Sequence, residues 1–175
     1  SIDASMTLLD RLYSITGNKN KEVVLYLSMG FGNPYGDTWS EELVEDWVHR
    51  LNSNFSPSII AISDTIGCAN PGQVERLFKN LNASFNSIEF GAHLHVLPDN
   101  VQDLSEAAFN GGCRRFDSVI KGFGGCPMAK DDLTGNMPTE LLLKWIEAQG
   151  ITHGVKNDAF NDALAFSSQV FKSNN

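Results

Sequence analysis

The sequence predicts an α/β protein whose strands lie parallel in one sheet. Three observations carry this prediction: short apolar runs alternate with segments of helical periodicity, the strand–helix units repeat roughly every thirty residues, and polar residues follow each apolar run. Parallel strands joined by right-handed crossover helices produce such an alternation. Spacing alone leaves two architectures open, a small doubly wound sheet and one half of an eight-stranded barrel.

The first elements of the chain are a helix, a strand and a second helix. Apolar residues recur at helical spacing over residues 3–15, and Gly17 ends this helix. The uninterrupted apolar run at residues 23–27 predicts a strand that is buried on both faces. Thr38, with Glu41 three residues later, predicts a capping box. A second helix is therefore expected to begin at this point.

The same alternation continues to the end of the chain. Further strands are predicted at residues 59–62, 88–95 and 115–120, and further helices at residues 71–81, 98–111, 138–150 and 158–171. Asn70 and Pro71 supply an N-cap and a first-turn proline to one of these helices. No low-complexity linker interrupts the pattern, so residues 1–175 are predicted to form one domain.

The composition predicts a globular protein that binds neither nucleic acid nor a membrane. Hydrophobic residues make up 42% of the chain, which is enough to bury a core. The net charge of −8 argues against the basic face that nucleic acids and anionic membranes require, and no apolar run is long enough to span a bilayer. Cys68, Cys113 and Cys126 are too few for a disulfide framework and show no CxxC spacing. We therefore expect a reducing compartment, which is the cytoplasm or, in a eukaryotic source, the mitochondrial matrix.

Polar residues stand at the carboxyl end of every predicted strand. They are Ser28, Asp64, Thr65, His93, His95 and Lys121. Parallel α/β folds place their active sites at this edge of the sheet. The alternative is that polarity simply returns where a strand ends, but four polar strand ends together favour a functional site.

The His93-Leu94-His95 triplet is the sharpest local signal for metal binding. Side chains at positions i and i+2 of a strand point the same way, about 6.6 Å apart along the chain, so two imidazoles can approach one metal ion. A pair of hydrogen-bonded core histidines is the alternative interpretation. His49 and His153 lie on a helix and near a helix end, and both are interpreted as structural or solvated.

A glycine-rich segment at residues 122–127 is the second signal. Its glycines allow the backbone to approach a ligand closely and allow the loop to move. Cys126 is expected to be more exposed there than a core cysteine, and a nearby cation would lower the pKa of its thiol. Cys68 and Cys113 are interpreted as small packing residues.

Several segments together resemble the hydroxymethylglutaryl-CoA lyases. The matching segments are Gly-Phe-Gly-Gly-Cys-Pro-Met-Ala at 122–129, Thr-Gly-Asn at 134–136, Ile-Ser-Asp-Thr-Ile-Gly at 62–67, Pro-Gly at 71–72, Ala-His-Leu-His at 92–95, Asn-Pro-Tyr at 33–35 and Gly-Ile-Thr-His-Gly-Val at 150–155. The glycine–cysteine–proline element is specific, because the related isopropylmalate and homocitrate synthases share the barrel and the His-x-His triplet but lack this element. The resemblance extends over nearly the whole chain.

This resemblance implies that residues 1–175 are the C-terminal half of a (β/α)8 TIM barrel. The chain would begin at the helix that follows the fourth strand. The family's first strand supplies an arginine and an aspartate ligand, and it has no counterpart here. The missing barrel half is therefore expected to be needed, the isolated fragment is expected to be inactive, and a homodimer is expected from the family.

The resemblance also implies an activity and a set of site residues. The family uses a divalent metal, Mg²⁺ or Mn²⁺, to cleave 3-hydroxy-3-methylglutaryl-CoA, an acyl-CoA substrate, to acetyl-CoA and acetoacetate. The implied metal ligands are His93, His95 and Asn136, the implied catalytic residues are Cys126 and Asp64, and the implied substrate-binding residues are Thr65 and Glu140. The metal would act as a Lewis acid and template, and Cys126 would assist proton transfer.

Three departures from the family pattern keep other functions open. Val96-Leu97 replaces the Asp-Thr that follows the family's His-x-His, residues 130–133 carry larger and charged side chains, and the aspartate usual after Glu140 is absent. A related aldolase or Claisen-type acyl-CoA synthase acting on another hydroxy acid is one alternative. A non-catalytic degenerate homologue is the other.

Overall fold

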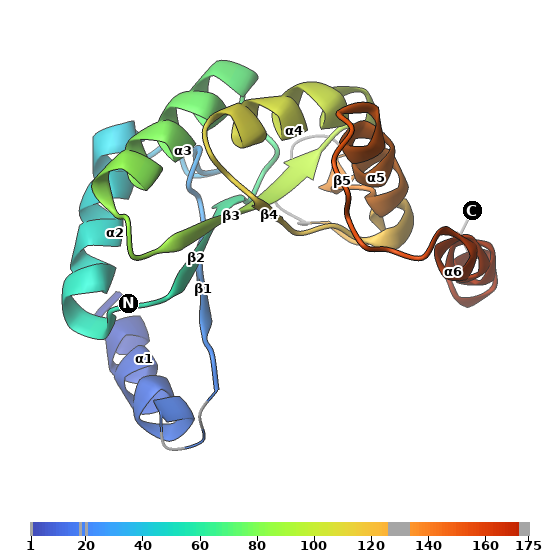
Figure 1. The fold of residues 1–175 in the computed structure, drawn as a ribbon. Coiled ribbons are helices and arrows are strands. Elements are labelled where there is room, and N and C mark those ends of the chain that lie inside the picture. Colours follow the sequence, from blue (N-terminus) through green and yellow to red (C-terminus); the bar gives the residue numbers. More distant parts are fainter. Residues whose placement is uncertain (1, 18, 20, 126–133, 172–175) are drawn as a thin grey trace.

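The computed structural model describes residues 2–17, 19, 21–125 and 134–171. Its elements follow the predicted alternation of helices and strands (Figure 1). They are α1 (Ile2–Gly17), β1 (Val24–Leu27), α2 (Glu41–Phe55), β2 (Ile59–Asp64), α3 (Pro71–Ser84), β3 (Glu89–Val96), the 3-10 helix η1 (Pro98–Asn100), α4 (Val101–Asn110), β4 (Arg115–Phe116), the 3-10 helix η2 (Ile120–Gly122), β5 (Gly135–Asn136), α5 (Thr139–Ala148) and α6 (Asn157–Val170). No helix in these ranges is long and apolar enough to cross a membrane.

The sheet confirms the predicted parallel topology. Strands β1 to β4 lie side by side in chain order, and each neighbouring pair is parallel. The order does not reverse, which excludes a doubly wound arrangement within these strands. Helices α2, α3 and α4 lie along one side of the strands, whereas the other side is left open in Figure 1. The short strand β5 adds one antiparallel pairing, to the end of β3.

The two faces of the sheet differ in their side chains. On the face that packs against the helices, Ile60, Ile62, Phe90 and Leu94 are all buried and belong to the main apolar core. The alternation of a strand sends the residues between them to the open face, where Ala61 is aligned with Gly91. Small residues therefore occupy the middle of the open face.

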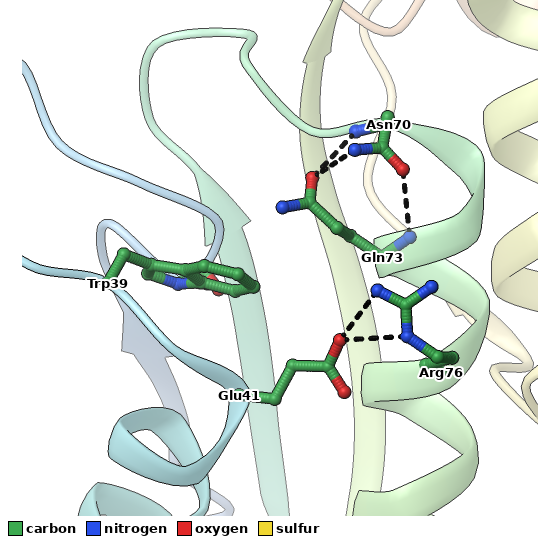
Figure 2. A network of polar contacts seen from close by, with 6 residues as sticks. Trp39, Glu41, Asn70, Gln73 and Arg76 are labelled. Atoms are coloured by element: carbon green, nitrogen blue, oxygen red, sulfur yellow. Dashed lines mark hydrogen bonds and ion pairs between the residues drawn. The ribbon is translucent and has the colours of Figure 1, made fainter.

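An ion pair between Glu41 and Arg76 joins α2 to α3, and further hydrogen bonds cap the start of α3 (Figure 2). Nε and Nη2 of Arg76 lie 3.1 and 3.0 Å from Oε1 of Glu41. Asn70 is the N-cap of α3, as predicted, and it also forms a capping box with Gln73. The predicted cap at Thr38 is wrong, because α2 begins at Glu41 and the side chain of Ser40 accepts from the amide of Leu43.

Strand β4 is shorter than the predicted strand at residues 115–120. Pairing with β3 covers only Arg115 and Phe116, although the amide of Asp117 still donates to the carbonyl oxygen of Ala92. The backbone then turns toward the segment before α5, where Val119 bridges to Pro138. Lys121 consequently lies in η2 with a positive φ of 58° and is not a strand-end residue.

An apolar hollow of about 730 Å³ lies between α1, β1 and α2. Its lining includes Met6, Leu9, Leu25 and Trp47. Within the described part of the chain, β1 has a partner strand on one side only, which is β2. The hollow thus adjoins the free edge of the sheet.

Candidate metal and catalytic site

The two histidines of the triplet lie on the open face of β3, near its carboxyl end. Their ring centroids are 5.5 Å apart, with the planes nearly perpendicular. The side chain of His93 is about one-third exposed, whereas His95 is buried at 8% exposure. Neither ring lies among the apolar side chains of the helix-facing core, although the burial of His95 is what a hydrogen-bonded core histidine would also show.

Each imidazole uses its Nδ1 atom in a contact with the protein. Nδ1 of His95 lies 3.0 Å from the carbonyl oxygen of Thr65, and Nδ1 of His93 lies 3.0 Å from Oδ2 of Asp117. A carbonyl oxygen can only accept a hydrogen bond, and so can an ionised carboxylate. Each contact therefore requires a proton on Nδ1. In a neutral ring, Nε2 then carries the lone pair. Metal-binding histidines typically show this arrangement, with one nitrogen held by an acceptor and the other turned to the ion.

Asn136 is brought to the same face by β5. Its Cα is the antiparallel partner of His95, and directly opposed residues of an antiparallel pair project from the same face. The Nδ2 atom of Asn136 donates to the carbonyl oxygen of Phe123 at 2.9 Å. This bond turns the amide nitrogen toward the glycine-rich segment and leaves Oδ1 as an acceptor without a hydrogen bond to any described residue. The three predicted ligands therefore occupy neighbouring positions of one surface.

Close backbone contact explains one glycine of the segment before β5. A Cβ atom on Gly122 would lie 2.7 Å from the carbonyl oxygen of Asn136, and the φ of Gly122 is +63°. A side chain there would both clash and strain the backbone. Gly122 thus allows the segment to lie directly against the strand that carries Asn136.

The donor set fits a divalent cation but is incomplete. Two imidazoles and one amide oxygen supply ligand types that borderline cations accept. Among the described residues, no cluster of three or more His, Cys, Asp and Glu side chains could hold a metal ion. An aspartate ligand from the missing barrel half, which the family resemblance implies, stays a prediction.

Asp64 lies on the opposite face of the sheet from the two histidines. It is 1% exposed, and its Cα is aligned with that of Leu94, on the helix-facing side of the sheet. Its two carboxylate oxygens accept from the amides of Cys68 and Ala69 at 3.0 and 2.8 Å. Asp64 therefore holds the turn after β2 in shape, and a catalytic role stays a prediction.

Thr65 and Glu140, the predicted substrate contacts, both bind backbone groups. Oγ1 of Thr65 accepts from the amide of Met29, and its carbonyl oxygen contacts His95. Oε2 of Glu140 accepts from the amide of Lys121 at 3.0 Å, where the backbone has its positive φ. Each residue thus supports a neighbouring part of the site. Cys126, the predicted loop cysteine, lies outside the described residues.

Tyr26 and Asp117 are site residues that sequence reasoning missed. The Tyr26 hydroxyl donates to Oδ2 of Asp117 at 2.8 Å, and its ring lies edge-on to His93 at 5.4 Å. The hydrogen bond to Asp117, followed by partial burial and the charge of Asp117, raises the pKa of Tyr26 above its ordinary value. The available signal was a tyrosine inside the apolar run of β1, which alternation places on the open face.

Sequence comparison places these residues in a known context. The model of the HMGL-like family matches residues 21–166. A hydroxymethylglutaryl-CoA lyase of Bacillus subtilis is 31% identical over 159 residues, which cover 89% of this chain and 52% of that protein. The cytoplasmic 3-hydroxy-3-methylglutaryl-CoA lyase of Rattus norvegicus is 28% identical over 89% of this chain and 45% of its own length. The chain thus spans about half the length of the curated relatives it matches.

Solved structures show the same partial coverage. The HMG-CoA lyase of Bacillus subtilis superposes with a TM-score of 0.87 at 29% identity, over 97% of this chain and 56% of that one. An HMG-CoA lyase from Acinetobacter baumannii, in complex with coenzyme A and 3-methylmalate, gives a TM-score of 0.80 at 27% identity, over 91% of this chain and 52% of that one. The superposed neighbours are TIM barrels, so the predicted α/β fold, half of a (β/α)8 barrel, is confirmed.

Proposed function

Since the chain belongs to the HMGL-like family, we propose that it forms one half of the active site of a hydroxymethylglutaryl-CoA lyase. The reaction is cleavage of 3-hydroxy-3-methylglutaryl-CoA to acetyl-CoA and acetoacetate. The observation that carries the proposal is the pairing of His95 with Asn136 on the face that also bears His93. This arrangement supports a cation site at the carboxyl ends of the strands, where barrel enzymes react.

The residues of this chain would hold and orient a Mg²⁺ or Mn²⁺ ion. His93 and His95 would offer their Nε2 atoms, because each Nδ1 atom contacts an acceptor. Asn136 would offer Oδ1, with its amide nitrogen fixed by Phe123. When bound, such an ion supplies Lewis-acid polarisation of the substrate's oxygens.

The remaining predicted residues would act around this centre. Cys126 is proposed to help transfer a proton to the leaving acetyl-CoA carbanion, as the resemblance implies. Thr65 fixes the ring of His95 through its carbonyl oxygen, and Glu140 fixes the backbone of Lys121 beside the glycine-rich segment. Direct contact of Thr65 or Glu140 with the acyl-CoA stays a prediction.

The missing barrel half is the proposed partner. The free edge of β1 and the apolar hollow beside α1 support this proposal, because a closed barrel leaves no free edge. The relatives are about twice as long as the segment they share with this chain. A homodimer, expected from the family, stays a prediction.

A second candidate is the same cleavage on a substrate with a longer 3-alkyl group. A Pseudomonas aeruginosa relative named 3-hydroxy-3-isohexenylglutaryl-CoA/hydroxymethylglutaryl-CoA lyase is 30% identical over 79% of this chain. That identity is nearly the same as for the Bacillus subtilis enzyme. Comparison of the two acyl-CoA substrates in one assay distinguishes the candidates.

The test measures cation binding and cleavage separately. Electron paramagnetic resonance titration with Mn²⁺ should reveal one site, and His93→Ala or Asn136→Ala should each weaken binding at least roughly tenfold. Acetyl-CoA release is then assayed with the chain alone and with a fragment that carries the first barrel half of the Bacillus subtilis relative. Cleavage is expected only in the complemented sample. Mn²⁺ affinity that is unchanged in both variants would contradict the proposal.

The variant Cys126→Ala sharpens the assignment within the complemented sample. It should lower turnover strongly while Mn²⁺ affinity stays the same, because the proposed role is proton transfer rather than coordination. Full cleavage activity in this variant would exclude the lyase mechanism and favour a Claisen-type relative, which needs no such cysteine.

A further inference from the structure

Asp117 joins three strands of the open face through one oxygen atom. Its Oδ2 accepts from the Tyr26 hydroxyl at 2.8 Å and contacts Nδ1 of His93 at 3.0 Å. Tyr26 lies on β1 and His93 on β3, whereas Asp117 directly follows β4. The Asp117 carboxylate therefore connects the side chains of Tyr26 and His93, which are far apart in the sequence.

The two histidines of the site are held in different ways. Nδ1 of His95 contacts a backbone carbonyl oxygen, that of Thr65, whose position is set by the fold. Nδ1 of His93 contacts a side chain that is about one-third exposed and that packing alone does not fix. The orientation of His93 consequently depends on where the Asp117 carboxylate is held.

We propose that Asp117 is the positioning residue of His93 and that Tyr26 holds Asp117 in place. An ionised carboxylate only accepts, so its contact requires the proton on Nδ1 and leaves the Nε2 lone pair toward the neighbouring His95 and Asn136. The inference rests on the proposed function in one respect only, which is that Nε2 of His93 binds a divalent cation. The arrangement of the three side chains is independent of any cation.

The first arm of the test reads the tautomer of His93 without metal. Nitrogen-15 NMR of histidine-labelled protein, at about pH 8 where an ordinary imidazole is neutral, distinguishes Nδ1–H from Nε2–H. The unaltered protein should show His93 as the Nδ1–H tautomer. Asp117→Ala should move it toward Nε2–H, whereas Asp117→Asn should largely keep Nδ1–H, because the amide oxygen can still accept.

The second arm measures Mn²⁺ affinity in the same proteins. Asp117→Ala should weaken binding roughly 10–100-fold, the range typical of groups that orient a metal-binding histidine. Tyr26→Phe should weaken it less, since it removes one of two contacts to the carboxylate. Asp103→Ala is the matched control, because this exposed residue of α4 makes the same change of charge away from the site.

Four outcomes decide between the inferences. A tautomer shift in Asp117→Ala, without Mn²⁺ binding by the unaltered protein, supports the positioning role and contradicts the proposed function. Retention of the Nδ1–H tautomer in Asp117→Ala overturns the positioning role. If the unaltered protein binds Mn²⁺, equal Mn²⁺ affinities of Asp117→Ala and Asp103→Ala overturn it as well. If Asp117→Ala does not fold, Tyr26→Phe takes its place, and an unchanged His93 signal and Mn²⁺ affinity in that variant overturn the proposal.

Discussion

The two faces of β3 differ in the kind of side chain that they carry. Phe90 and Leu94 point to the helices, are nearly fully buried and belong to the apolar core. His93 and His95 point to the open face and contact Asp117 and Thr65, which directly follow β4 and β2. Adjacent residues of one strand thus belong separately to the core and to the proposed site, so changes to one face should leave the other face intact.

The largest expected effect comes from exchanging the neighbours Leu94 and His95 for alanine. Leu94→Ala should lower the free energy of unfolding by about 2–5 kcal/mol, because it leaves a cavity in a packed core. His95→Ala should remove most of the Mn²⁺ affinity, with a smaller effect on stability. Urea unfolding and Mn²⁺ titration of both variants test this separation. Loss of Mn²⁺ binding in a folded Leu94→Ala protein would break the comparison.

The variant Asp64→Ala tests whether a polar residue on the helix-facing side of the sheet stabilises the fold. Asp64→Ala should lower the free energy of unfolding by about 3 kcal/mol, since the amides of Cys68 and Ala69 lose a charged acceptor. Asp103→Ala, an exposed control, should change it by less than about 0.5 kcal/mol. Urea unfolding measures both. A fully stable Asp64→Ala protein that has lost activity would instead support the catalytic role.

The smallest expected effect concerns Cys113, a polarizable side chain deep in the core. Burial raises the pKa of its thiol to about 12. The unfolded thiol ionises near its ordinary value of about 8.5, so the unfolded chain releases this proton first and stability is lost as pH rises between those values. At pH 10 the loss should be about 2 kcal/mol relative to pH 7. Urea unfolding of the unaltered protein and of Cys113→Ala at both pH values isolates this contribution, and equal pH slopes would contradict it.

Local patterns in the sequence predict the elements of this fold but not all of their partners. The parallel order of the strands follows from alternation, and the N-cap at Asn70 follows from its own residue type and the proline after it. The early end of β4 depends on the bridge from Val119 to Pro138, which is a contact with a distant segment. No pattern within the predicted strand at residues 115–120 could show that contact.

The site shows the same limit. His93 and His95 are predicted to share a face because their spacing fixes it, and they do. Alternation places Asp64 on the same face as Ile60 and Ile62, but β2 is buried on both faces, so its sequence does not show which face packs against the helices. Tyr26 and Asp117 are 91 residues apart, and only the assembled sheet brings them into contact.

The two-residue strand β5 also sets an order of assembly. Its pairing of Gly135 with Val96 closes a loop that contains α4, β4 and η2. Closing a flexible loop of this length costs on the order of 3 kcal/mol in chain entropy, and two residue pairs return little of it. The strands β1 to β3 pair through shorter connections, so we expect Asn136 to reach the histidines only after α4 has packed. We therefore expect the contact between Asn136 and His95 to form late in folding and to open at a lower free energy than the core strands.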